Sequence, residues 1–376
     1  MEAQRRTGST FSVLPLLSYN PRSLRGTLPS CVLYRGTSIV PSHRVVSERG
    51  KYVTADLSVL LRRPRVTRRA VLGCSLWLAA FAAQAESTRK YVMSAKEERL
   101  KPVVAVENGC AWPNLTVLQD GTIVATIHNR PSHLKEPADV ECWASEDEGR
   151  TWARRGMPAP RDNDRVARGN VAAGLAANGD LIVITSGWSD PVSETRGTIV
   201  EPLVSRSTDG GRTWTIDDGA FLAEWPIVGP GQKRRYLVPF GDILPGSDGA
   251  LRVAMYGGQM GVTVVYRSED DGKTWDKPTA INPNAKIHEP AFFHLGKGKW
   301  LLAARFDGLD LYTSDDDAGT WTRRQQLTGR QQHPGHLMRL KDGRVLLTYG
   351  NRLEPKGIDV RFSDDEGASW GDPLRV

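Results

Sequence analysis

The stretch SEDEGRTW, at Ser145–Trp152, is the first of five copies of one eight-residue phrase, and these copies decide the fold. The other four are STDGGRTW at Ser207–Trp214, SEDDGKTW at Ser268–Trp275, SDDDAGTW at Ser314–Trp321 and SDDEGASW at Ser363–Trp370. The pattern predicts a tight turn, because the Asp carboxylate can cap backbone N–H groups and the Gly accepts a positive φ. The Trp then covers the turn with apolar area. Recurrence along the chain indicates a radial or stacked repeat with one supersecondary unit per copy.

A second pattern stands in front of each phrase: an apolar run, a turn containing Gly, and another run rich in Val, Ile and Leu. It occurs at Trp112–Arg130, Asn170–Trp188, Tyr236–Gly258, Glu289–Gly308 and His333–Arg352. Such a pattern predicts a β-hairpin. A third strand enters the phrase and a fourth leaves it. Four antiparallel strands per unit predict the blades of an all-β propeller.

The order of the strands indicates where function can lie. Antiparallel neighbours put the start of strand one and the end of strand two at the same end of a blade, which we call the site end. The repeated turns lie at the opposite end, so we expect their aspartates to be scaffold. The positions at the site end are Trp112, Arg130, Asn170, Trp188, Asp190, Tyr236, Tyr256, His288, Glu289, Arg305, His333, His336 and Arg352. Arginine binds carboxylates bidentately, so this set predicts an anionic, hydroxylated ligand.

With these residues and the repeated phrase, the chain resembles the sialidase (neuraminidase) superfamily, whose repeated turn is called the Asp-box or BNR motif. The resemblance covers roughly residues 103–376. It implies a six-bladed β-propeller of four-stranded antiparallel blades, with the last blade incomplete in this chain. The propeller domain is expected over residues 100–376.

The resemblance also assigns roles to single residues. Glu289 corresponds to the glutamate that activates the nucleophile, and Asp139 to the acid/base aspartate. Arg305 and Arg352 correspond to arginines that bind the substrate carboxylate, and Arg130 to the arginine that ends the first hairpin. The other expected substrate-binding residues are His288, His333, His336 and Trp112.

Two departures from the family pattern stand out. The family begins its first blade with Arg-Ile-Pro, whereas this chain has Ala111-Trp112-Pro113. The family's nucleophile is a tyrosine after the last arginine, and no tyrosine follows Tyr349 here. The sequence is therefore either a fragment or belongs to a protein that does not use that nucleophile.

Three functions are compatible with these residues. The first is an exported sialidase-like exo-glycosidase that removes terminal sialic acid or a related acidic sugar from glycans. The second is a propeller polysaccharide lyase or hydrolase acting on glycans that contain uronate. The third is a non-catalytic carbohydrate-binding propeller. In each, the partner is a sialylated or other acidic glycan. No cofactor is expected, and no metal, because the histidines lack ligand-type spacing on one element.

The charge of the chain is concentrated in a separable leader. Residues 1–85 carry 13 Lys and Arg against 3 Asp and Glu, whereas the rest carry 37 against 40, so bulk charge does not favour nucleic-acid binding. Arg68-Arg69, the uncharged run 70–83 and Ala83-Gln84-Ala85 predict a twin-arginine signal peptide at 66–85. The run is too short for stable membrane insertion. We therefore expect export to the bacterial periplasm or beyond, with residues 1–65 an unstructured extension or a wrongly called start. The oligomeric state, and the pairing of Cys110 with Cys142, stay open.

Overall fold

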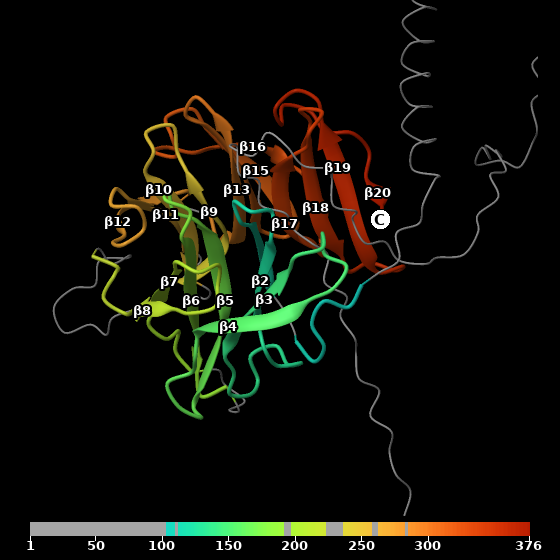
Figure 1. The fold of residues 1–376 in the computed structure, drawn as a ribbon. Helices are drawn as coiled ribbons and strands as arrows, with labels where there is room; N and C mark the ends of the chain where they lie inside the picture. The colour runs from blue at the N-terminus through green and yellow to red at the C-terminus, as the bar shows by residue number, and fades with distance from the viewer. Residues whose placement is uncertain (1–102, 110–111, 192–196, 223–235, 258–261, 283–284) are drawn as a thin grey trace, which may run out of the picture. The chain divides into compact units, whose positions relative to one another are not determined.

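The computed structural model describes residues 103–109, 112–191, 197–222, 236–257, 262–282 and 285–376. The predicted extension, the signal peptide and Cys110 lie outside these residues. Within them every regular element is a β-strand, which confirms the all-β prediction (Figure 1). None of the described residues form a helix long and apolar enough to cross a membrane.

The strands form five units of four, and within each unit neighbours along the chain pair antiparallel. The first two units are β1 (Asn114–Val117), β2 (Ile123–His128), β3 (Val140–Ser145), β4 (Ala153–Ala159) and β5 (Val166–Leu175), β6 (Leu181–Ser189), β7 (Leu203–Ser207), β8 (Thr215–Asp217). The next two are β9 (Val238–Pro245), β10 (Leu251–Gly257), β11 (Val262–Ser268), β12 (Asp276–Ala280) and β13 (His288–Gly296), β14 (Lys299–Arg305), β15 (Leu309–Ser314), β16 (Thr322–Gln326). The last is β17 (Gln332–Arg339), β18 (Val345–Asn351), β19 (Gly357–Ser363), β20 (Leu374–Arg375).

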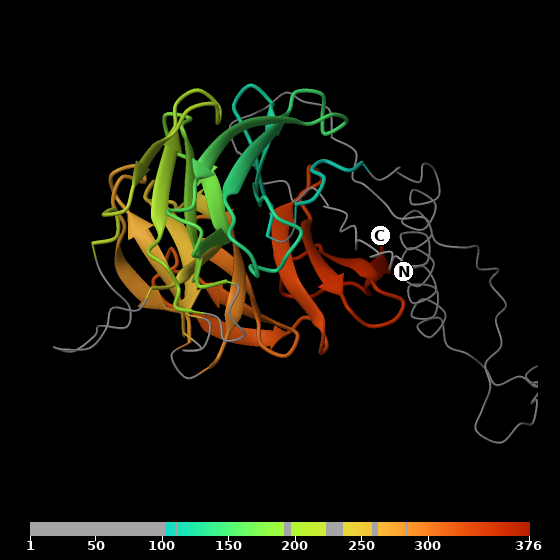
Figure 2. The same ribbon diagram turned by 90° about the horizontal axis from the view of Figure 1, so that it is seen from below.

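The units follow one another around a common centre in sequence order, as the colours show in Figure 2. The first strand of each unit lies innermost, and β5 and β9 pair parallel through Ala172–Gly174 and Gly241–Ile243. This pairing joins the second and third units into one eight-stranded sheet. The described part of the chain therefore holds five blades of the predicted kind, and a sixth remains an implication of the resemblance.

Each repeated phrase forms the predicted turn between the third and fourth strands of its blade. In the first, Ser145 Oγ donates to Asp147 Oδ1 at 2.8 Å, while the amide and hydroxyl of Thr151 donate to Asp147 at 2.8 and 2.7 Å. The same bonds recur in the other four copies. The hydrogen bonds from Thr151 and then Ser145 lower the pKa of Asp147 to about 2. The capping role predicted for the repeated aspartates is confirmed.

The fifth residue of every phrase adopts a positive φ, as the glycines predicted. The values are Gly149 86°, Gly211 92°, Gly272 83°, Ala318 70° and Gly367 90°. Ala318 stands at the glycine position of the fourth copy and keeps the same conformation. The turn geometry is therefore held by the hydrogen bonds to Asp316 even where glycine is replaced.

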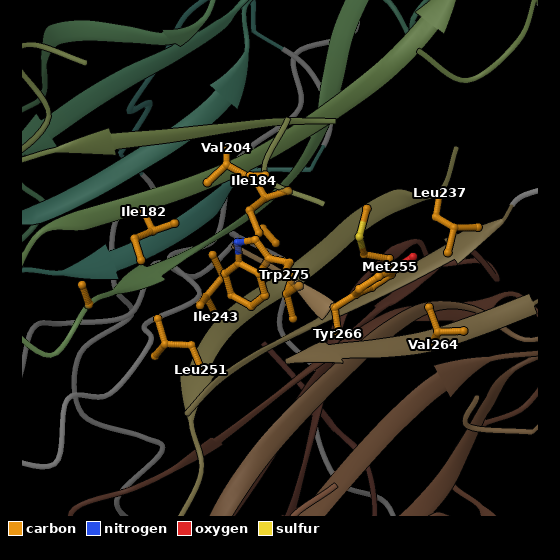
Figure 3. Close-up of a cluster of buried hydrophobic side chains, with 14 residues drawn as sticks. Ile182, Ile184, Val204, Leu237, Ile243, Leu251, Met255, Val264, Tyr266 and Trp275 are labelled. Atoms are coloured by element: carbon orange, nitrogen blue, oxygen red, sulfur yellow. The ribbon is translucent and has the colours of Figure 1, made fainter. Parts of the chain in front are cut away.

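A large apolar cluster lies between the second and third blades, and it centres on the Trp of the third phrase. Trp275 is fully buried there and packs with residues including Ile182, Ile243 and Leu251 (Figure 3). Its ring stacks on Phe221 at a centroid distance of 6.4 Å. The scaffold end of the blades thus contributes directly to the core between them.

Candidate functional site

Four of the five innermost strands have irregular pairing toward the site end, and each of these four irregularities carries a polar side chain. The register shifts lie between Arg168 and Val171 in β5, between Ile243 and Phe240 in β9, between His288 and Ala291 in β13, and between Gln332 and Gly335 in β17. A β-bulge re-aims side chains and is common beside active sites. The polar residues inside these bulges are Asn170, Asp242, Glu289 and His333.

Glu289 and Arg305 form an ion pair at the start of the fourth blade. Both carboxylate oxygens of Glu289 lie 3.0 Å from Nη1 of Arg305. Glu289 has a φ of 42°, and its side chain is 12% exposed, whereas that of Arg305 is 33% exposed. The bulge therefore turns the Glu289 carboxylate toward Arg305. The Arg305 side chain itself stays partly exposed to solvent.

Arg352 and His333 join this pair from the fifth blade. Nη1 of Arg352 lies 3.1 and 3.2 Å from the two ring nitrogens of His333, and His333 Nδ1 lies 3.8 Å from Glu289 Oε2. Burial, with the charges of Arg305 and Arg352, lowers the pKa of His333 to about 4, so its ring is neutral at pH 7. Burial and the charge of Arg305 also lower the pKa of Arg352. This arginine cluster (Glu289, Arg305, His333 and Arg352) holds two guanidinium groups and one carboxylate, and that carboxylate pairs with Arg305 while Arg352 lies against His333. The excess positive charge favours an anionic ligand.

Aromatic side chains border the arginine cluster on the side of the third blade. His288, which pairs with Arg305 in the ladder, stacks on Tyr256 with ring centroids 5.7 Å apart. Burial, followed by the charge of Arg305, lowers the pKa of His288. Trp112 packs against the cluster of buried side chains that includes Tyr256, and its ring lies 4.6 Å from that of His133. The predicted binding residues His288 and Trp112 thus form an apolar wall beside the arginines.

The predicted acid Asp139 is held by a different set of residues. It is buried immediately before β3, where Oδ1 accepts from the Arg161 amide and Oδ2 from Arg161 Nη1, both at 2.8 Å. Asn129 Nδ2 also lies 3.4 Å from Oδ2. Arg130 follows β2 and is exposed. Both residues lie at the site end, as predicted, but the hydrogen bonds of Asp139 go to Asn129 and Arg161 rather than to the arginine cluster.

His336 belongs to a buried network that sequence reasoning missed. Its Nε2 lies 3.0 Å from Asp242 Oδ2, while Asn114 Nδ2 donates to Asp242 Oδ1 at 3.0 Å and to the Gly241 carbonyl at 2.7 Å. The network links β1, β9 and β17 across the centre of the blades. Its one visible signal was Gly241-Asp242, a charged residue after a glycine inside an otherwise apolar strand.

Among the described residues, no three His, Cys, Asp or Glu side chains are grouped so as to hold a metal ion. Cys142 is a buried free thiol, and burial raises its pKa to about 12. The polar groups of the described site are carboxylates, imidazoles and guanidinium groups.

Comparison with solved structures gives the fold. The chain is similar to a protein of unknown function from Dyadobacter fermentans, with a TM-score of 0.59, 21% identity, and coverage of 71% of this chain and 83% of that one. It is also similar to a Hadza microbial sialidase, with a TM-score of 0.54, 20% identity, and coverage of 70% and 57%. A third similar structure is Trypanosoma rangeli sialidase with the inhibitor DANA, with a TM-score of 0.52, 19% identity, and coverage of 71% and 49%. The architecture is thus a sialidase-like β-propeller.

Sequence comparison gives the family. A curated xyloglucanase from a Paenibacillus species is 27% identical over 191 residues, which are 44% of this chain and only 18% of that enzyme. The family model of the BNR repeat-like domain matches residues 121–376. That match spans all five repeated turns and the first hairpin from its turn onward, together with the whole arginine cluster. The chain therefore belongs to the BNR repeat-like domain family.

Proposed function

We propose that the protein is an exported glycosidase that hydrolyses glycans ending in a sugar with a carboxylate, either sialic acid or a related acidic sugar. The arginine cluster is the observation that supports this proposal. Two guanidinium groups from adjacent blades lie together at the site end, Arg305 paired with Glu289 and Arg352 against His333, and a carboxylate of the substrate could bind to Arg305 in place of Glu289. Export rests on the leader sequence, and a complete six-bladed ring rests on the family resemblance.

Substrate binding and activation of Glu289 are coupled in this proposal. Without substrate, Arg305 is occupied by both oxygens of Glu289. The carboxylate of the sugar competes for Arg305 and Arg352, and Glu289 is then released to accept a proton from the nucleophile. Asp139 protonates the leaving oxygen after its bonds to Arg161 are exchanged. No tyrosine follows Tyr349 in the sequence, so this proposal assigns no residue as the nucleophile.

A lyase acting on uronate is the second candidate, and one observation favours it. Two neutral imidazoles stand beside the arginines: His333 against Arg352, and His288 stacked on Tyr256. A neutral imidazole can abstract the proton next to a carboxylate whose charge the arginines neutralise. Trp112 stands where the family has its first arginine, and this replacement also suits an acidic sugar smaller than sialic acid. A third alternative is a binding protein that uses the same cluster without turnover.

Turnover assays on arginine variants test these proposals. Fluorogenic sialosides and glucuronides report hydrolysis, and the ultraviolet absorbance of an unsaturated product from a polyuronate reports elimination. We expect Arg305→Ala to lower kcat/KM by about 100-fold or more, with Arg305→Lys only partly restoring it. The matched control is Arg150→Ala, because Arg150 is an exposed arginine at the scaffold end.

The outcomes separate the alternatives. Equal rates for wild type and Arg305→Ala would remove Arg305 from substrate binding. Elimination without hydrolysis would favour the lyase. Tight binding of an acidic sugar that is neither hydrolysed nor eliminated would favour the binding protein.

A further inference from the structure

The buried network of Asn114, Asp242 and His336 takes no part in the proposed mechanism. We call these three residues the central network. They come from β1, β9 and β17, the innermost strands of the first, third and fifth blades, and each is more than nine-tenths buried. Burial of a carboxyl group such as that of Asp242 is costly unless other groups pair with it. A carboxyl group retained between three blades therefore requires a reason.

One end of the central network completes the bulge in β9. The pairing of β9 with β10 shifts between Phe240 and Ile243, so Gly241 and Asp242 are the inserted residues. Ladder pairing does not hold the inserted residues of a bulge against the partner strand. Asn114 Nδ2 holds them instead, because it donates to the Gly241 carbonyl at 2.7 Å and to Asp242 Oδ1 at 3.0 Å. The orientation of Asp242 is thus fixed by a residue of another blade.

The other end of the central network reaches β17 directly after its bulge. The pairing of β17 with β18 shifts between Gln332 and Gly335, and His336 lies opposite Thr348 in the regular ladder that follows. A carboxylate oxygen accepts, so Nε2 of His336 donates to Asp242 Oδ2 at 3.0 Å. Among the described residues, the buried Nδ1 has no hydrogen-bond partner. The polar role of this ring is therefore its bond to Asp242.

The bulge in β17 is held from two sides. On the side of the fourth blade, a Cβ at Gly335 would lie 2.7 Å from Leu309 Cδ1, so the backbone packs closely there. On the side of the centre, the bond from His336 to Asp242 ties the strand to β9. Loss of that bond would leave the bulge held by packing on one side only.

His333 is the residue that this bulge presents to the site. Only two residues separate it from His336, and one of them is a proline whose ring fixes φ. The two ring nitrogens of His333 lie 3.1 and 3.2 Å from Nη1 of Arg352, and its Nδ1 lies 3.8 Å from Oε2 of Glu289. A displacement of His336 would therefore move His333 relative to Arg352 and Glu289.

We propose that the central network positions the arginine cluster: Asp242, oriented by Asn114, holds His336 and so keeps His333 against Arg352. The three residues of the network are positioning residues, because they act through His333. This inference deepens the proposed function and rests on it, since it takes the arginine cluster as the site that binds the acidic sugar. The placement of His333 itself can be measured without any substrate.

The first test follows the titration of His333 by NMR in protein with 13C-labelled histidine. The His333 signal is assigned by its absence from His333→Gln. The charged groups that face the ring are Glu289, Arg305 and Arg352, so its pKa reports whether the ring stays among them. In the wild type, burial and the charges of the two arginines lower the pKa of His333 to about 4. If the ring leaves this position, the pKa should rise by about one unit or more, toward 6.5.

Three variants of the central network give the expected pattern. His336→Leu removes the N–H group and should raise the pKa of His333. Asp242→Leu has a similar shape but accepts no hydrogen bond, so it should raise this pKa as well. His336→Gln keeps an N–H group at a similar distance from the backbone and lacks only an equivalent of Nδ1, so it should retain the wild-type titration.

The second test measures the binding of a methyl glycoside of sialic or glucuronic acid by isothermal titration. Both leucine variants should raise Kd about tenfold, because Arg352 loses the contact that orients it, whereas His336→Gln should bind as the wild type does. Gly272→Ala is the matched control, because it destabilises the fold from a repeated turn at the scaffold end, where its Cβ would lie 2.3 Å from Ile182 Cδ1. It should leave the His333 titration and the Kd unchanged.

The outcomes separate the inference from the proposed function. An unchanged pKa of His333 in both leucine variants, or the same rise in Gly272→Ala, would overturn the inference. So would a rise in His336→Gln as large as that in His336→Leu. If the wild type binds neither acid, the proposed function is contradicted, while the NMR titration still decides the role of the central network. Should His336→Leu fail to fold, as judged by circular dichroism, Asp242→Leu carries the same prediction.

Discussion

Replacing Trp275 by Ala tests whether the repeated turns are scaffold. The ring is fully buried between the second and third blades and stacks on Phe221, while its backbone bonds to Ala220 and Leu222 at 2.8 and 2.9 Å. Its indole N–H has no hydrogen-bond partner, so the substitution removes packing alone. A large buried ring replaced by Ala costs about 3–5 kcal/mol. For a domain of this size each kcal/mol lowers Tm by about 2–4 °C, so we expect a decrease of roughly 6–20 °C.

Thermal and urea denaturation, followed by circular dichroism, measure the loss of stability in Trp275→Ala. The glycoside assay at a permissive temperature measures its activity. The comparison variant is Trp152→Ala, because Trp152 is only half-buried and donates to the Gly149 carbonyl at 3.1 Å. Trp152→Ala should lower the free energy of unfolding by about half as much as Trp275→Ala or less, because Trp152 buries less apolar area. The reasoning is refuted if Trp152→Ala destabilises more than Trp275→Ala. It is also refuted if Trp275→Ala abolishes activity without changing the denaturation midpoint.

Two further predictions concern the turns and the site. Gly149→Ala should lower the free energy of unfolding by about 1 kcal/mol, because the φ of Gly149 is 86° but the new Cβ meets only Trp152, at 3.9 Å. Gly272→Ala should lower it by about 2–5 kcal/mol, because its Cβ would also lie 2.3 Å from Ile182. Equal urea midpoints for the two variants would contradict this prediction. The pKa of His333 is lowered to about 4 in the folded protein, so between pH 6.5 and 4 the unfolded chain binds a proton at His333 more readily than the folded protein does. Stability should therefore fall as the pH falls through that range, and His333→Gln should remove this part of the loss when urea midpoints at pH 7 and 4.5 are compared. An unchanged pH dependence in His333→Gln would show that His333 is not the buried neutral group.

The blades could be predicted from the sequence because their turns are local. Each repeated phrase carries its Ser, Asp and Thr within eight residues, so the bonds around Asp147 follow from spacing alone. The parallel pairing of β5 with β9 could not be predicted in the same way. It is formed by main-chain groups of Ala172–Gly174 and Gly241–Ile243, and main-chain groups leave no side-chain pattern in the sequence.

The site was predictable where its residues lie near the ends of strands, and not where a bulge aims a residue from the middle of a strand. Glu289, Arg305 and Arg352 begin or end strands of adjacent blades, so topology brings them to one end, and their contacts confirm this. Asp242 stands in the middle of an apolar strand, and only the bulge aims it at His336. Arg161, the partner of Asp139, follows the fourth strand of the blade and lies 22 residues further along the chain. No local sequence pattern spans that distance, so the pair could not be predicted.

The bulges on the innermost strands have a consequence for how this architecture can diversify. The inserted residues, among them Asn170, Asp242, Glu289 and His333, are surplus to the register of their ladders. Substitution there can alter what the centre recognises while the pairing on either side persists. Rigidity is meanwhile supplied by the repeated turns at the far end. Natural variation in ligand preference can thus be confined to a few inserted positions, which makes them the first places to randomise when specificity is to be redirected.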